Sequence, residues 1–127
     1  MKHRTGPAIT IDVTTRYLDE QSEPANGHFL FAYTIRIGNA GDESAQLVSR
    51  RWVITDANGK VDRVEGDGVV GEQPWLHPGE GFEYTSGAML DTDLGTMEGS
   101  YTMVTGDGAR FEVPIPAFTL TVPRTLH

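Results

Sequence analysis

One run of alternating side chains constrains the fold of this chain more than any other feature. Across residues 29–37 a large apolar side chain stands at every second position. A period of two places these side chains on one face of an extended strand, which is typical of a strand buried on one side. Asn39 and Gly41 follow the run and end it. The apolar members are Phe29, Phe31, Tyr33, Ile35 and Ile37.

The same period recurs along the chain, and a helical period is almost absent. Further strands are expected at residues 8–17, 46–56, 61–65, 82–86, 100–105 and 109–122. Asn58-Gly59 lies between two of them, and this pair favours the positive φ values of a tight hairpin. About seven short antiparallel strands separated by turn residues predict an all-β fold, a β-sandwich of the immunoglobulin or fibronectin type III-like kind.

Three local features refine this prediction. Trp52 stands in the middle of a predicted strand, where such sandwiches often keep a core tryptophan. The run Gly99–Met103 resembles a tyrosine corner centred on Tyr101. The apolar parity changes at Pro114–Pro116, which indicates a bulge and an edge strand that a partner peptide could extend.

Length and composition limit the kind of protein. We expect one domain over residues 1–127, with an ordered core from about residue 7 to residue 123. The chain contains no cysteine, which excludes disulfides, thiolate zinc sites and cysteine nucleophiles. The N-terminus has no apolar signal-peptide region, and no stretch approaches the roughly 20 apolar residues of a membrane span. We therefore expect a cytoplasmic protein without a membrane partner.

The charge is unevenly distributed. The formal net charge of −8 argues against nucleic acid as a partner, because phosphates are held by clustered lysines and arginines. Residues 62–98 contain nine acids and one base, Arg63, so this segment alone carries −8. We interpret it as a solvated face, with a cation-attracting surface or a docking face for a basic partner as alternatives.

The string GDGVVG matches the G-x-G-x-x-G pattern of dinucleotide-binding loops through Gly66, Gly68 and Gly71. A pyrophosphate loop needs a buried strand before the glycines and a helix after them. Here a polar run precedes them, and Pro74 and Pro78 prevent a long helix afterwards. We interpret the string as loop-forming, and keep nucleotide or pyrophosphate binding, with Mg²⁺-dependent hydrolysis, as the alternative function.

No catalytic or metal constellation stands out, so we expect no enzyme and no cofactor. The histidines are far apart in the sequence: His3, His28, His77 and His127. Weak candidates for holding Mg²⁺ or Co²⁺ are Glu80, Glu83, Asp91 and Asp93, because hard cations prefer oxygen ligands. Their spacing fits no known loop motif, and no nucleophile and base are paired in the sequence.

Residues 74–78 contain an aromatic residue between two prolines. Such a segment can present an anchor to a partner, since aromatic residues are enriched in interface hot spots. We therefore predict that Trp75, Leu76 and His77 contact a protein partner. The alternative is that Trp75 folds back and covers one end of the sandwich.

Several of these stretches together resemble the ApaG family, also called CorD. They are GDGVVGEQPWLHPGEGFEYTSGAML, GTMEGSY and IPAF, and the similarity is dense from Val53 to Leu120. The resemblance implies a bacterial, fibronectin type III-like sandwich with a genetic link to cobalt and magnesium resistance. It also implies an interaction module, because related domains occur in a eukaryotic F-box protein and in a DNA-polymerase-delta-interacting protein. The family's glycine motif falls on Gly66, Gly68 and Gly71.

Overall fold

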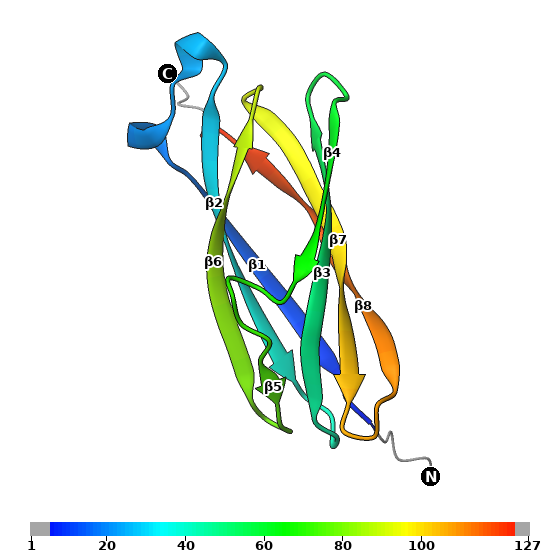
Figure 1. Cartoon of the computed structure of the whole chain (residues 1–127). Coiled ribbons are helices and arrows are strands. Elements are labelled where there is room, and N and C mark those ends of the chain that lie inside the picture. The colour runs from blue at the N-terminus through cyan, green and yellow to red at the C-terminus, as the bar shows by residue number, and fades with distance from the viewer. Residues whose placement is uncertain (1–5, 124–127) are drawn as a thin grey trace.

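The computed structural model describes residues 6–123, and within them it is built almost entirely of β-strands (Figure 1). The strands are β1 (Ile9–Tyr17), β2 (Phe29–Asn39), β3 (Ala45–Asp56), β4 (Val61–Asp67), β5 (Trp75–Leu76), β6 (Gly81–Leu90), β7 (Leu94–Thr105) and β8 (Arg110–Thr121). Two single turns of 3-10 helix, η1 (Asp19–Gln21) and η2 (Pro24–Asn26), connect β1 to β2. Predictions that involve His3 and His127 lie outside the described residues.

The strands form two antiparallel sheets that pack face to face. One has the order β1-β2-β6, and the other has the order β4-β3-β7-β8 with β5 beside the first residues of β3. The predicted immunoglobulin or fibronectin type III-like sandwich is therefore confirmed, with eight strands in place of about seven. Figure 1 shows β5 at the opposite end of the sandwich from the β3–β4 turn.

Two strand segments were not expected from the sequence. The short β5 forms where we predicted loop, and β7 begins at Leu94, six residues before the predicted start. Gly95 and Gly99 both lie in β7, where neighbouring backbone comes too close for a side chain. A Cβ at Gly99 would lie 2.0 Å from the carbonyl oxygen of Arg51. Close approach of two backbones is one of the reasons for glycine inside a strand.

The core lies between the sheets and is centred on aromatic residues. Trp52 is 2% exposed and makes edge-on contacts with Tyr33 and Phe118 across the two sheets. The alternating side chains of β2 are buried from Phe31 to Ile37, as the period predicted. Burial of aromatic side chains in such edge-on geometry contributes packing energy beyond the area removed from water.

Tyr101 is not part of a tyrosine corner. A corner tyrosine donates its hydroxyl to nearby backbone, whereas the hydroxyl of Tyr101 forms a hydrogen bond with the hydroxyl of Tyr84 on the other sheet. Burial raises the pKa of both phenols above their usual value, and for Tyr101 the neighbouring Tyr84 raises the pKa further. The pair therefore joins the two sheets through neutral hydroxyls.

The two predicted irregularities occur near their expected places. The register between β7 and β8 shifts between the pairs Met97–Phe118 and Gly99–Ile115, so β8 bulges next to its prolines. β8 is also an outer strand, as predicted. The β3–β4 turn differs in detail: only Gly59 has positive φ, and the carboxylate of Asp56 accepts the N–H groups of Asn58 and Lys60. The turn spans residues 57–60, as the predicted strand ends at Asp56 and Val61 imply.

No helix between residues 6 and 123 has the length and apolarity to cross a membrane.

Candidate functional site

β5 holds Trp75 in a defined position beside β3. Trp75 pairs with Gln46 and Leu76 pairs with Ala45. The N–H of Leu47 donates to the carbonyl of Pro74 over 3.0 Å, which extends the pairing by one step. Backbone pairing on both sides of Trp75 limits the conformations that this segment can adopt.

Trp75 and Leu76 face opposite sides of β5, as successive residues of a strand must. The side chain of Trp75 is 44% exposed, whereas that of Leu76 is 2% exposed and belongs to the core. The prediction that Leu76 contacts a partner is therefore wrong, because its side chain is occupied inside the sandwich. Trp75 does not fold back over the end of the sandwich and remains accessible.

Asn39 fixes the loop from the inside of the molecule. Its side-chain amide donates to the carbonyls of Leu76 and Glu43, over 2.9 and 2.8 Å, and its side-chain oxygen accepts the N–H of Gly41. Asn39 is 2% exposed, so these bonds compensate the cost of burying its polar group. The sequence suggested only the end of a strand at Asn39. Its hydrogen bond to Leu76, 37 residues away, could not be predicted from the neighbouring residues.

His77 lies in an exposed turn and makes structural contacts. Its ring Nδ1 is 2.7 Å from the hydroxyl of Ser44, and its backbone N–H donates to the carboxylate of Glu80. Gly79 completes this turn with a φ of +84°. The turn thus occupies one carboxylate oxygen of Glu80.

The glycines of the GDGVVG string each have a local role. A Cβ at Gly66 would lie 2.7 Å from the guanidinium of Arg50. Nη1 of Arg50 donates to the carbonyls of Asp67 and Gly68, both over 3.0 Å. Gly68 has a φ of +62°, and a Cβ there would lie 2.3 Å from the carbonyl oxygen of Glu72. The glycine string therefore directs carbonyl groups toward the guanidinium of Arg50.

The second half of the string forms a tight turn from Val69 to Glu72. These two residues exchange both backbone hydrogen bonds, and the N–H of Gly68 donates to the carbonyl of Val48. Three N–H groups that a phosphate loop would offer to a ligand, those of Gly68, Val69 and Glu72, are thus bonded within the chain. Val70 has a φ of +43°, an uncommon conformation for a β-branched residue, and its side chain is 55% exposed.

The four acids suggested as metal ligands do not come together. Glu80 and Glu83 lie at the start of β6, and Asp91 and Asp93 lie after its end. Seven residues of β6, 84–90, separate Glu83 from Asp91, which is about 26 Å along the strand. Within residues 6–123 no group of three or more histidine or acidic side chains is placed to hold a metal ion.

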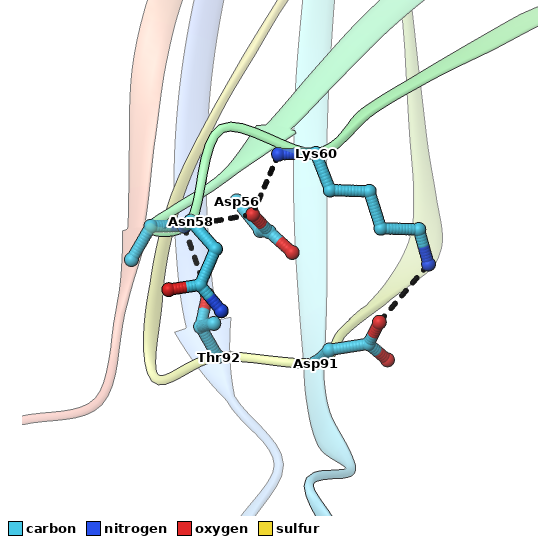
Figure 2. A network of polar contacts seen from close by, with 6 residues as sticks. Asp56, Asn58, Lys60, Asp91 and Thr92 are labelled. Carbon is cyan, nitrogen blue, oxygen red and sulfur yellow. Dashed lines mark hydrogen bonds and ion pairs between the residues drawn. The ribbon is translucent and has the colours of Figure 1, made fainter.

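Two of these acids form ion pairs on the surface. Glu83 accepts from Arg36 over 2.8 Å, and Asp91 accepts from Lys60 over 3.0 Å. The hydrogen bond and charge of Asp91 raise the pKa of Lys60 above its usual value. Figure 2 shows Lys60, Asp56 and Asn58 in the β3–β4 turn facing Asp91 and Thr92 in the β6–β7 turn. This network joins the two sheets at the end opposite β5.

The chain matches the ApaG domain family model over residues 19–105. A protein named ApaG from Stenotrophomonas maltophilia (strain K279a) is 59% identical over 120 residues, which is 94% of each chain. A protein named ApaG from Thiobacillus denitrificans (strain ATCC 25259 / T1) is 60% identical over 119 residues, again 94% of each chain.

The fold agrees with that of a solved relative. The crystal structure of the putative ApaA protein from Bordetella pertussis superimposes with a TM-score of 0.92 at 52% sequence identity, over 95% of this chain and 98% of that one. The family resemblance noted in the sequence is confirmed by both comparisons. This chain belongs to the ApaG domain family.

Proposed function

We propose that this chain is a non-enzymatic protein-binding module that docks its partner on the loop between β4 and β6. We define the docking loop as residues 68–80, with Trp75, Val70 and His77 as its contact residues. The observation that carries the proposal is the exposed indole of Trp75 on a segment whose backbone is paired and whose neighbour Leu76 is buried. An aromatic side chain on a backbone that is already ordered before binding loses little conformational entropy when it binds a partner.

The strained turn beside this anchor supports the same surface. Val70 places a large apolar side chain in solvent and holds a left-handed backbone conformation, which costs of the order of 1–2 kcal/mol. Strain of this kind persists where the position serves a purpose other than stability. The family's link to cobalt and magnesium handling would then act through the partner.

The test compares two exposed residues in affinity capture from bacterial extract followed by mass spectrometry. Trp75→Ala removes the anchor, whereas Met89→Ala removes an exposed side chain near the far end of β6. We expect the Met89→Ala variant to recover the partner like the unmodified protein, and Trp75→Ala to weaken binding by about 30-fold, as for a hot spot. Equal recovery by the two folded variants would reject the docking loop.

Nucleotide binding at the glycine string is the competing function, and a titration separates it from docking. ATP, diadenosine tetraphosphate and pyrophosphate are added with Mg²⁺ while the amide resonances are followed by NMR. We expect no localised shift at Gly66, Gly68 or Gly71, because the N–H groups of Gly68, Val69 and Glu72 are bonded to carbonyls. Saturable shifts centred on these glycines would favour the nucleotide function.

A further inference from the structure

The edge of β4 is open and regular, unlike the edge of β8. β4 pairs with β3 on one side and with no strand among the described residues on the other. Its seven residues include no proline and no register shift. β8 carries a bulge and two prolines, which lack the N–H that strand pairing needs, and β1 approaches it. The edge that a partner strand can extend is therefore β4, and not the last strand as the sequence suggested.

The hydrogen bonds at both ends of β4 show which backbone groups point outward. The N–H of Asp56 donates to the carbonyl of Lys60, and the N–H of Gly68 donates to the carbonyl of Val48. Because backbone groups of an antiparallel strand alternate between its two sides, the even-numbered residues of β4 face β3. Val61, Arg63 and Glu65 therefore direct their N–H and C=O groups away from the sheet.

A polar groove of about 300 Å³ runs from this edge across the five-stranded sheet as far as β8. Its polar lining comes from four strands and holds two bases and three acids: Ser49, Arg50, Arg51, Glu65, Asp67, Ser100, Thr102 and Glu112. Arg51 is already paired with Glu65 over 2.9 Å. Neither Asp67 nor Glu112 has an ion-pair partner in residues 6–123, although Thr102 donates to Glu112. The groove has an excess of negative charge.

The apolar side chains of β4 add a second contact. Val64 pairs with Trp52 in the register, so its side chain points to the inner side of the sheet, yet it is 39% exposed. Val61, on the outer side, is 45% exposed. A strand placed beside β4 would cover both valines.

From this edge, its groove and its charge we infer that β4 binds an extended, basic segment of the partner protein by strand addition. The segment pairs with the backbone of Val61, Arg63 and Glu65, and its lysines or arginines face Asp67 at the β4 end of the groove. The inference rests on the proposed docking function and extends the same surface, because β5 and Trp75 lie along the same side of β3 as β4 does.

Two other arrangements fit the charges less well. A second copy of this chain would bring together two molecules of net charge −8, whose acidic segments both include β4. The outer strand of the other sheet, β6, has its acid Glu83 already paired with Arg36. A basic strand on β4 meets opposite charge that is not yet compensated.

The experiment uses defined peptides with the full chain and NMR detection. The probe is an eight-residue peptide of alternating lysine and valine, and its two controls are the glutamate–valine peptide and the fully N-methylated lysine–valine peptide. We expect the probe to shift the resonances of Val61–Asp67. It should also slow the amide exchange of Val61, Arg63 and Glu65 by about tenfold at ten times its Kd. The N-methylated peptide has the same charge but cannot donate backbone hydrogen bonds, so it should not bind there.

Variants of the edge provide the matched test. Arg63→Pro removes an N–H that faces solvent and should abolish the effect, whereas Arg63→Ala keeps this N–H and should retain it. Asp67→Asn should weaken binding by about two- to fivefold, whereas Glu112→Gln, on the opposite outer strand of the sheet, is the matched control and should leave it unchanged. If Arg63→Pro does not fold, the N-methylated peptide still decides the question.

Several results would overturn the inference. They are equal binding of the N-methylated peptide, equal binding of the glutamate–valine peptide, shifts centred on β6 or β8, and self-association through β4 in sedimentation without peptide. The outcome is separable from that of the docking loop. Loss of partner capture by Trp75→Ala, together with no peptide effect on β4, would keep the docking loop and reject strand addition.

Discussion

The two tryptophans of this chain occupy opposite environments, and the difference separates the part of the molecule that maintains the fold from the part that is available for binding. Trp52 is 2% exposed and packs against Tyr33 and Phe118, so its side chain contacts only protein. Trp75 is 44% exposed on the docking loop, although its backbone is paired with β3. The docking loop therefore combines a fixed backbone with a largest side chain that remains in solvent.

The largest expected effect is at Trp52. Trp52→Ala should lower the free energy of unfolding by about 3–5 kcal/mol, because it leaves a large cavity between the sheets. The measurement is denaturant unfolding followed by circular dichroism. Trp52→Phe is the matched control and should cost less, since it keeps an aromatic ring and removes an indole N–H that has no partner within the described residues. Equal losses for the two variants would contradict the packing explanation.

The glycine string supplies the next test, because it joins the core sheet to the docking loop. Gly68→Ala should destabilise the protein by about 2–3 kcal/mol, through a left-handed φ and a clash with the carbonyl of Glu72. Gly71 has a φ of +81° but open space around it. Gly71→Ala should therefore lower the free energy of unfolding only through backbone strain. Chemical denaturation of both variants measures the difference. A larger loss at Gly71 would refute the steric argument.

The buried pair of tyrosines tests the link between the sheets. Tyr84→Phe removes one hydroxyl and leaves that of Tyr101 buried without its partner, which should cost about 1–2 kcal/mol. The double variant Tyr84→Phe/Tyr101→Phe should cost less than the sum of the single variants, because no unpaired hydroxyl remains. A fully additive result in the double-mutant cycle would show that the hydroxyls do not interact.

The same pair predicts the response to high pH. Burial raises the pKa of both phenols in the folded state, whereas in the unfolded chain tyrosine ionises near pH 10. The stability that these groups contribute is therefore complete below about pH 10 and decreases as the pH rises above it. Unfolding measured between pH 8 and pH 11.5, about the range needed, should show this loss, and the double phenylalanine variant should show less of it.

A smaller effect of opposite sign is expected in the docking loop. Val70→Asn should raise the free energy of unfolding by about 1 kcal/mol, because asparagine tolerates a left-handed backbone and the valine side chain makes little contact. Val70→Ala keeps a Cβ in the same conformation and should gain less. The unfolding midpoints of the two variants measure the effect, and a loss of stability in Val70→Asn would show that Val70 is not strained.

The smallest effect on stability is expected at Trp75, where the effect on binding is expected to be largest. Trp75→Ala should change the free energy of unfolding by no more than about 0.5 kcal/mol, as for an exposed site. The same denaturant titration as for Trp52 measures it. A loss comparable with that of Trp52→Ala would mean that the indole stabilises the fold, and the contrast between the two tryptophans would disappear.

Much of the architecture was predictable because its signals are local. The alternation in residues 29–37 predicted a buried strand face, the parity change at Pro114–Pro116 predicted a bulge on an outer strand, and Trp52 was expected in the core. The family was also recognisable from its motifs. The length of β7 was underestimated, because the close approach of neighbouring backbone at Gly95 and Gly99 has no local signal in the sequence.

The candidate site was only partly predictable. Trp75 was correctly singled out as an exposed aromatic residue, but nothing in its own segment distinguishes it from Leu76, which is buried. The roles of Asn39 and Arg50, which hold the loop and the glycine string, were not predictable, because their hydrogen-bond partners are distant in the sequence. The four acids proposed as metal ligands were close in sequence, yet the extended backbone of β6 keeps their two pairs apart.

By itself, then, the sequence determined the periodic and compositional properties of this protein. These are the all-β class, the strands with a period of two, the family, and an acidic segment with a net charge of −8. They depend on neighbouring residues and on sums over the chain, which folding does not change. Only the tertiary structure decided which side of β5 faces the core, which edge of the sheet is open, and that Arg50 occupies the carbonyls of the glycine string. Each of these depends on contacts between residues far apart in the chain.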